Sequence, residues 1–128
     1  MKRIVLASVV LLVAAAPLAH AGWKASGPVL IYPTNRFAQG GMGEARSSPG
    51  TQSYLGCKTI TYGTTDYLAC FAADTAGTYA SCYTYDAKLI EAARSLTTAS
   101  YLFFSWTASG ICNEIDVSNI SYFAPMVP

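Results

Sequence analysis

The alternation of apolar and polar residues indicates that the chain is built mainly of β-strands from residue 53 onward. Runs rich in Thr, Tyr and Ile are separated by short turns that contain Gly or Asp, which is the pattern of successive strands. The expected strands are Tyr54 to Tyr62, Asp66 to Ala72, Thr78 to Thr84, Ser100 to Trp106 and Ile111 to Val117. The fourth is apolar on both faces and is therefore expected to lie in the centre of its sheet.

One helix is expected between the third and fourth strands. Asp86 lies where a helix N-cap is needed, and its carboxylate can accept hydrogen bonds from the free amides of the first turn. Apolar side chains then follow at helical spacing, namely Leu89, Ile90, Ala93 and Leu96. The order of three strands, a helix and two strands is that of the OB-fold, a five-stranded Greek-key barrel. We therefore predict a mainly β domain of the α+β class, an OB-like barrel with one helix; a β-sandwich with one helix is the alternative.

The pattern is weaker before residue 53. Val29 to Tyr32 is apolar and is expected to form a strand or a strap over the core. Asn35 to Gln52 is rich in Gly and Ser and has few apolar residues, which is typical of a long loop. Inside it, Gly40-Gly41-Met42-Gly43 lacks the Gly-Lys-Ser/Thr ending of a phosphate-binding loop, so we interpret this run as a flexible linker.

The first residues have the pattern of a secretory signal peptide. Lys2 and Arg3 precede an apolar run from Ile4 to Ala16, and small residues at Ala19 and Ala21 suit cleavage after Ala21. We expect a secreted or periplasmic protein with no membrane span after processing, because no second apolar run of about 20 residues follows. The expected organisation is a signal peptide at 1–21, an extension and loop at 22–52, a compact β domain at 53–124 and a tail at 125–128.

Export changes the chemistry that remains. Cleavage removes His20, the only histidine of the sequence, so no imidazole is left for general-base catalysis or metal binding. The loss of Lys2 and Arg3 leaves six cations against seven carboxylates and lowers the net charge from +1 to −1. A nearly neutral protein lacks the positive field that holds a phosphate backbone. We therefore expect no catalytic residues, no cofactor, no metal and no nucleic-acid partner.

The cysteines predict crosslinks. An even number of cysteines in a small exported chain is typical of disulfides, and the spacing here lacks the paired Cys-x2-Cys of zinc sites. The four cysteines are Cys57, Cys70, Cys82 and Cys112. Cys57 and Cys70 are symmetric about the turn at Gly63-Thr64, whereas Cys70 and Cys82 are symmetric about Ala76. Both pairings cannot hold, because they share Cys70.

The OB-like order favours one connectivity. In such a barrel the third strand lies beside the fifth, which places Cys82 near Cys112 and leaves Cys57 to pair with Cys70. Strand alternation, however, puts Cys112 on the same face as Glu114 and Asp116, which is an unusual face for a core disulfide. Either a β-bulge in the last strand turns Cys112 inward or this pairing is wrong, so the pairing of Cys70 with Cys82 stays open.

Four segments between residues 44 and 124 carry a resemblance to a known group of proteins. They are Tyr54-Leu55-Gly56-Cys57, Ser81-Cys82-Tyr83-Thr84, Ala93-Arg94-Ser95-Leu96 and the stretch from Ser100 through Trp106 to Gly110-Ile111-Cys112. Together they resemble small exported bacterial proteins of unassigned function. The resemblance implies export and a compact disulfide-bonded domain, and it implies no catalytic residue.

Aromatic residues of the second hairpin are the candidate binding site. If Cys70 and Cys82 share one face, strand alternation brings rings together on the other face. These rings are Tyr67, Phe71, Tyr79 and Tyr83. We expect them, with the loop from Asn35 to Gln52, to contact a protein or a glycan. The alternative is that the rings only stabilise the hairpin and are covered by the segment from Trp23 to Tyr32.

Two other functions stay open from the sequence. Glu114 and Asp116 point to one face of the last strand about 7 Å apart, a spacing between those of the two classes of glycoside hydrolase. A hydrolase that uses carboxylates is therefore one alternative. A structural component of the cell envelope without a discrete ligand is the other.

Overall fold

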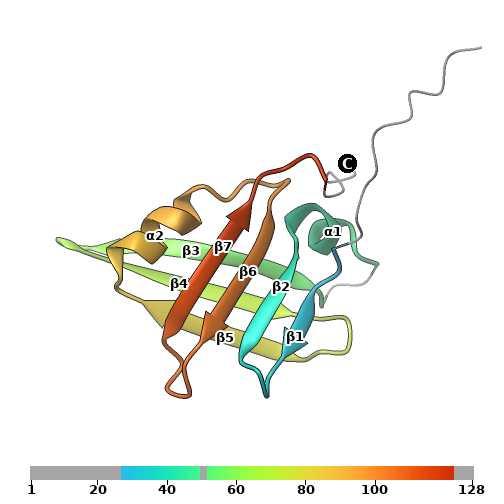
Figure 1. Ribbon diagram of the computed structural model, residues 1–128, viewed down its shortest axis with the longest axis horizontal. Helices are drawn as coiled ribbons and strands as arrows, with labels where there is room; N and C mark the ends of the chain where they lie inside the picture. The colour runs from blue at the N-terminus through green and yellow to red at the C-terminus, as the bar shows by residue number, and fades with distance from the viewer. Residues whose placement is uncertain (1–26, 50–51, 123–128) are drawn as a thin grey trace, which may run out of the picture.

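The computed structural model describes residues 27–49 and 52–122, which form two antiparallel β-sheets and two helices (Figure 1). One sheet has the strand order β1-β2-β6-β7 and the other has the order β3-β4-β5. The expected signal peptide, Trp23 and the tail at 125–128 lie outside the described residues. Within the described part of the chain, no helix has the length and apolar character needed to cross a bilayer.

The elements follow one another in an order close to the one expected. The strands are β1 (Leu30–Tyr32), β2 (Phe37–Gly41), β3 (Tyr54–Tyr62), β4 (Thr65–Ala73), β5 (Tyr79–Thr84), β6 (Tyr101–Trp106) and β7 (Cys112–Ser118). The helices are α1 (Met42–Ser47) and α2 (Ala87–Arg94). The five strands and the helix expected after residue 53 are all present, with ends that differ by one residue at most from the prediction for each strand.

The mainly β, α+β class is confirmed, but a closed five-stranded barrel is wrong. The sheets form two layers whose strands cross (Figure 1). Closure needs the first and fourth predicted strands, β3 and β6, to pair. Instead β2 pairs with β6 on the edge that β7 leaves open, so β6 has no free edge for β3. The two-layer arrangement is that of the alternative prediction, with a second helix in addition.

The expected long loop from Asn35 to Gln52 is also wrong over much of its length. Its residues form β2 and α1, and β2 pairs along β6 in the four-stranded sheet. Gly40 allows the backbone of β2 to pack closely against the segment before β1. A Cβ on Gly40 would lie 3.0 Å from Val29 Cα and 3.1 Å from the carbonyl oxygen of Pro28. The run from Gly40 to Gly43 is therefore the junction of a strand and a helix and not a flexible linker.

The hydrophobic core lies between the two sheets and under α2. Leu102 and Phe104 of β6 and Leu68 of β4 are fully buried. The central position expected for β6 is confirmed, because it lies between β2 and β7. Helix α2 contacts β3, β4 and β7 and buries Ile90 and Ala93 at one end of this core.

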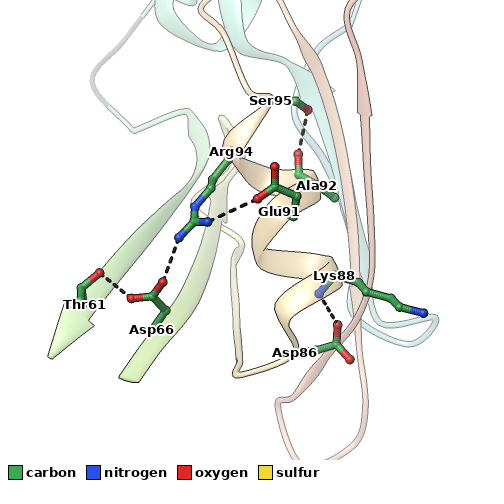
Figure 2. Close-up of polar contacts among 8 residues, drawn as sticks. All are labelled: Thr61, Asp66, Asp86, Lys88, Glu91, Ala92, Arg94 and Ser95. Atoms are coloured by element: carbon green, nitrogen blue, oxygen red, sulfur yellow. Dashed lines mark hydrogen bonds and ion pairs between the residues drawn. The ribbon is translucent and has the colours of Figure 1, made fainter. Parts of the chain in front are cut away.

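Helix α2 begins as the sequence predicts. The Asp86 carboxylate accepts a hydrogen bond from the amide of Lys88 at 2.8 Å (Figure 2). It also accepts one from the amide of Leu89 at 3.1 Å. Two of the amides that a helix leaves without partners are satisfied in this way. The Ser95 hydroxyl donates to the carbonyl of Ala92 at the other end, 2.7 Å away.

The disulfides have the favoured connectivity, Cys57–Cys70 and Cys82–Cys112. The first lies within the three-stranded sheet, and the second joins β5 to β7 and so links the two sheets. The β-bulge that this pairing required is present: Ser105 pairs with Glu114, whereas Trp106 pairs with Cys112. The extra residue of β7 lets Cys112 turn into the core, where it is 2% exposed, while Glu114 stays outside.

Candidate functional site

The outer face of the three-stranded sheet carries an unusual number of aromatic side chains. Cys70 lies directly opposite Cys82 on the inner face, so the residues beside them in each strand point outward. The register of β3, β4 and β5, continued by one residue past β5, places seven rings on this outer face, which we call the aromatic face: Tyr54, Tyr62, Tyr67, Phe71, Tyr79, Tyr83 and Tyr85.

Most rings of the aromatic face are open to solvent. Tyr79 is 53% exposed and Tyr83 is 44% exposed, whereas Phe104 in the core is not exposed at all. Phe103 is half-buried. The hairpin tyrosines are therefore more exposed than the phenylalanines of the central strand β6. Tyr67 and Phe71 are half-buried, which gives the face a packed centre and an open rim.

Several rings touch one another around Tyr85. The centroids of Tyr67 and Tyr85 are 5.8 Å apart in a tilted arrangement, and those of Tyr83 and Tyr85 are 6.3 Å apart, edge to face. Tilted and edge-to-face contacts are the favoured geometries of aromatic pairs. The rings around Tyr85 therefore form a connected cluster and are not isolated side chains.

The aromatic face carries little charge. The Lys58 ammonium lies 5.6 Å from the centroid of the Phe71 ring, within the range of a cation–π contact. Among the paired residues of β3, β4 and β5 that point to this outer face, Lys58 is the one charged residue, and none is acidic. The face is thus a nearly neutral aromatic surface with hydroxyl groups along it.

The four predicted site residues, Tyr67, Phe71, Tyr79 and Tyr83, all lie on the aromatic face. Sequence reasoning missed Tyr54, Tyr62, Tyr85 and Lys58. Two signals were present in the sequence. The alternation of β5 continues from Tyr83 to Tyr85. The β3–β4 hairpin turns at Gly63, and its register places Tyr54 and Tyr62 of β3 on the same sheet face as Tyr67 and Phe71 of β4.

A polar cluster holds the tip of the β3–β4 hairpin against α2. The Thr61 hydroxyl donates to Asp66 at 2.6 Å, and the Arg94 guanidinium binds the same carboxylate at 2.9 Å (Figure 2). Arg94 also contacts Glu91 at 3.3 Å. The Thr61 hydrogen bond, followed by the hydrogen bond and charge of Arg94, lowers the pKa of Asp66, and partial desolvation opposes them. The cluster fixes the strands that carry the aromatic face.

The predicted carboxylate pair lies on a different surface. Glu114 and Asp116 are both exposed on the outer side of β7, opposite Ser105 and Phe103 of β6. Neither lines a hollow of about 290 Å³ that lies among the described residues. That hollow is lined by Pro28, Val29, Glu44, Ala45, Ser47, Ser48, Pro49, Ser53 and Thr75. The Glu44 carboxylate there accepts a hydrogen bond from the amide of Gly27.

The outer face of the four-stranded sheet carries rings that pack mainly on each other. Tyr32 stacks on Phe37 with centroids 4.5 Å apart, and Phe37 stacks on Phe103 at 5.4 Å. Burial raises the pKa of Tyr101, and the nearby Tyr32 and Glu44 act in the same direction. These contacts join β1, β2 and β6, so this face is less open than the aromatic face.

The cysteines are the described residues whose grouping suits a metal ion. The sulfur atoms of Cys70, Cys82 and Cys112 lie within 4.8 Å of one another. Each belongs to a disulfide, and no described cysteine is free. A disulfide sulfur is not the thiolate that metals bind, so these sulfurs are not metal ligands in this state.

The fold and this surface define a small β-rich domain with two disulfides and an exposed aromatic sheet face. No family model, curated protein or solved structure matches the chain. The resemblance to small exported bacterial proteins therefore stays a prediction from the sequence.

Proposed function

We propose that this protein is an exported binding domain that contacts a glycan through its aromatic face. The observation that carries the proposal is the gathering of seven rings on one sheet face, with Tyr79 and Tyr83 about half exposed. Extended apolar patches on a protein surface usually mark an interaction site. Cross-strand packing alone does not require rings such as Tyr62, which is 85% exposed.

The shape of the face favours a polymer over a small ligand. Small molecules are held in concave pockets that cover most of their surface. The aromatic face is the outer side of an open sheet, and the described hollow does not include any of its rings. A flat face gives sufficient contact only to a ligand that extends across several rings.

The charge of the face favours a glycan over a protein. Protein partners gain specificity and association rate from complementary charges. The aromatic face offers Lys58 alone and no acidic side chain among its registered residues. Neutral sugar rings need no such pattern, because their C–H groups can lie on the negative face of an aromatic ring and their hydroxyls can bind Tyr hydroxyls. A protein partner is the second candidate.

Export supports this setting. The two disulfides are compatible with an extracellular protein. The N-terminal pattern from Lys2 to Ala21 supports secretion or a periplasmic location, where envelope glycans are within reach. A hydrolase that uses Glu114 and Asp116 receives less support, because this pair lies on the open outer side of β7.

Co-sedimentation with cell-envelope material tests the proposal. The purified protein is mixed with envelope fractions from its own culture that have been treated with protease, with glycosidases or with neither. We expect binding to survive protease treatment and to be lost after the glycan is degraded. Loss with protease alone would point to the protein partner. Absence of binding to every fraction would contradict the proposed function and favour a structural role.

A further inference from the structure

The four cysteines form one continuous group of sulfur atoms across the inside of the fold. Cys70 on β4 lies directly opposite Cys57 on β3 and also directly opposite Cys82 on β5. Cys112 reaches the group from β7, since it is bonded to Cys82. The sulfurs of Cys70, Cys82 and Cys112 are all within 4.8 Å of one another, so the two disulfides are neighbours.

One member of the group is nearer to solvent than the rest. Cys57 is half-buried, whereas Cys70, Cys82 and Cys112 are 0%, 4% and 2% exposed. Its strand, β3, has β4 as its only partner in the three-stranded sheet. The inner positions that follow Cys57 along β3, Thr59 and Thr61, are exposed. Cys57 is therefore the sulfur of this group that an external thiol can reach most readily.

We infer that Cys57 is a thiol-exchange site whose reaction passes inward to the second disulfide through Cys70. The reacting partner is a small thiol or dithiol, or the thiolate of a disulfide oxidoreductase. Thiol–disulfide exchange requires a thiolate that can reach a disulfide sulfur, and the grouping of these four residues supplies both steps.

The exchange proceeds in two balanced steps. The external thiolate attacks the Cys57 sulfur: a mixed disulfide forms at Cys57, the Cys57–Cys70 bond breaks and Cys70 leaves as a thiolate. The Cys70 thiolate then attacks Cys82: the Cys70–Cys82 bond forms, the Cys82–Cys112 bond breaks and Cys112 leaves as a thiolate that takes up a proton in its buried position. A second external thiol can resolve the mixed disulfide and free Cys57.

The exchange changes what the disulfides hold together. Before it, Cys82–Cys112 joins the two sheets and Cys57–Cys70 joins β3 to β4. After it, the Cys70–Cys82 bond joins β4 to β5 within one sheet, and no disulfide links the sheets. An external thiol could thus loosen the contact between the two sheets while one disulfide within the protein remains.

A pair of single variants tests the inference. In Cys57→Ser the thiol starts on Cys70, inside the sulfur group, and in Cys70→Ser it starts on Cys57, which does not belong to the three sulfurs within 4.8 Å. Each variant is held in native buffer at mildly alkaline pH, quenched in acid, alkylated and peptide-mapped. We expect Cys57→Ser to show a label on Cys112 and a Cys70–Cys82 crosslink, and Cys70→Ser to show a label on Cys57 alone. A label confined to Cys70 in Cys57→Ser would overturn the inference.

The wild-type protein gives the same answer if either variant fails to fold. It is treated with a limiting amount of dithiothreitol, quenched and mapped in the same way. The inference predicts free thiols on Cys57 and Cys112 in the singly reduced protein, joined by a Cys70–Cys82 crosslink. Free thiols on Cys57 and Cys70 with Cys82–Cys112 intact would mean simple reduction of the outer disulfide and would contradict the relay.

Discussion

Asp66 makes the stability of the β3–β4 hairpin, which carries part of the aromatic face, depend on pH. Its carboxylate is bound by the Thr61 hydroxyl and the Arg94 guanidinium, and these partners lower its pKa from the ordinary value of 3.8. A lowered folded-state pKa adds stability above the unfolded pKa, and that stability is lost as pH falls through the folded pKa. The contribution is therefore present at neutral pH and disappears in acid below 3.8.

Replacing Asp66 with Asn should lower the melting temperature at neutral pH, because the amide keeps the size of the side chain but loses its charge. The difference from wild type should vanish in strong acid, where Asp66 of the wild type is itself protonated. Glu91→Gln is the control, since Glu91 also contacts Arg94 but has a side chain that is 75% exposed. Thermal melts across the acid range check this, and an equal deficit of Asp66→Asn at every pH would contradict it.

Single residues were predictable where strand alternation was regular and unpredictable where it broke. The outward placement of Tyr79 and Tyr83 follows from alternation alone. The inward placement of Cys112 does not, because one extra residue opposite Ser105 and Trp106 reverses the face of the strand. The sequence could indicate that a bulge was needed for the Cys82–Cys112 pair but contained no local signal that established it.

At the scale of elements, α2 depends on its N-cap. The Asp86 carboxylate accepts hydrogen bonds from two backbone amides of α2. Because α2 has only eight residues, this cap is a large part of what stabilises the helix. Replacing Asp86 with Ala should destabilise the protein by about 1 kcal/mol, the usual cost of losing an N-cap. Asp86→Asn should be nearly neutral, because Asn caps about as well. Urea unfolding of both variants measures the difference, and equal losses would contradict the role of the cap.

The strands after residue 53 were predictable because runs rich in β-branched, aromatic and other apolar residues are separated by short turns that contain Gly or Asp. β2 was not, because the residues of Phe37–Gly41 include two glycines that carry no side-chain pattern. Their burial comes from close backbone contact, as at Gly40 beside Val29. Helix α1 has six residues and no side-chain cap, so it also lacks the usual start signal.

At the scale of the whole molecule, the two disulfides crosslink different parts of the fold. Cys57–Cys70 closes 13 residues within one sheet, whereas Cys82–Cys112 closes 30 residues and links the sheets. The chain-entropy relation gives about 2.9 kcal/mol for the first and about 3.6 kcal/mol for the second.

Removing each disulfide with paired serines should therefore destabilise the protein in both cases, and Cys82→Ser/Cys112→Ser should cost more than Cys57→Ser/Cys70→Ser. Cys82→Ser/Cys112→Ser also buries two hydroxyls, at positions that are 4% and 2% exposed, whereas Cys57→Ser/Cys70→Ser buries one, at the 0% exposed position of Cys70. Denaturant unfolding of the two double variants ranks them. If removing the intersheet disulfide lowers the free energy of unfolding less than removing the other, then loop length and burial do not determine how much each disulfide stabilises the protein.

The division into two sheets was less predictable than the strands themselves. A barrel and a two-layer fold use the same local alternation, and they differ only in which edges pair. Here β2 pairs with β6, and these paired residues are at least 60 positions apart in the sequence, so no local pattern indicates the contact. The placement of the predicted rings on one face survived this change because it depends only on the β4–β5 hairpin.

Glycan binding by a Tyr79→Ala/Tyr83→Ala variant is the most direct test of the aromatic face as the binding site. Tyr32→Ala is the matched control, because Tyr32 is 41% exposed, close to the 44% of Tyr83, but lies on the four-stranded sheet. We predict that the double variant keeps its melting temperature within a few degrees, since exposed substitutions usually change stability by about 0.5 kcal/mol or less. Its affinity for envelope glycan should fall at least about tenfold, or ~1.4 kcal/mol, while Tyr32→Ala binds as wild type. A soluble double variant that binds as tightly as wild type would contradict the aromatic face as the binding site. A double variant that does not fold would also contradict it, because that result is expected of core residues.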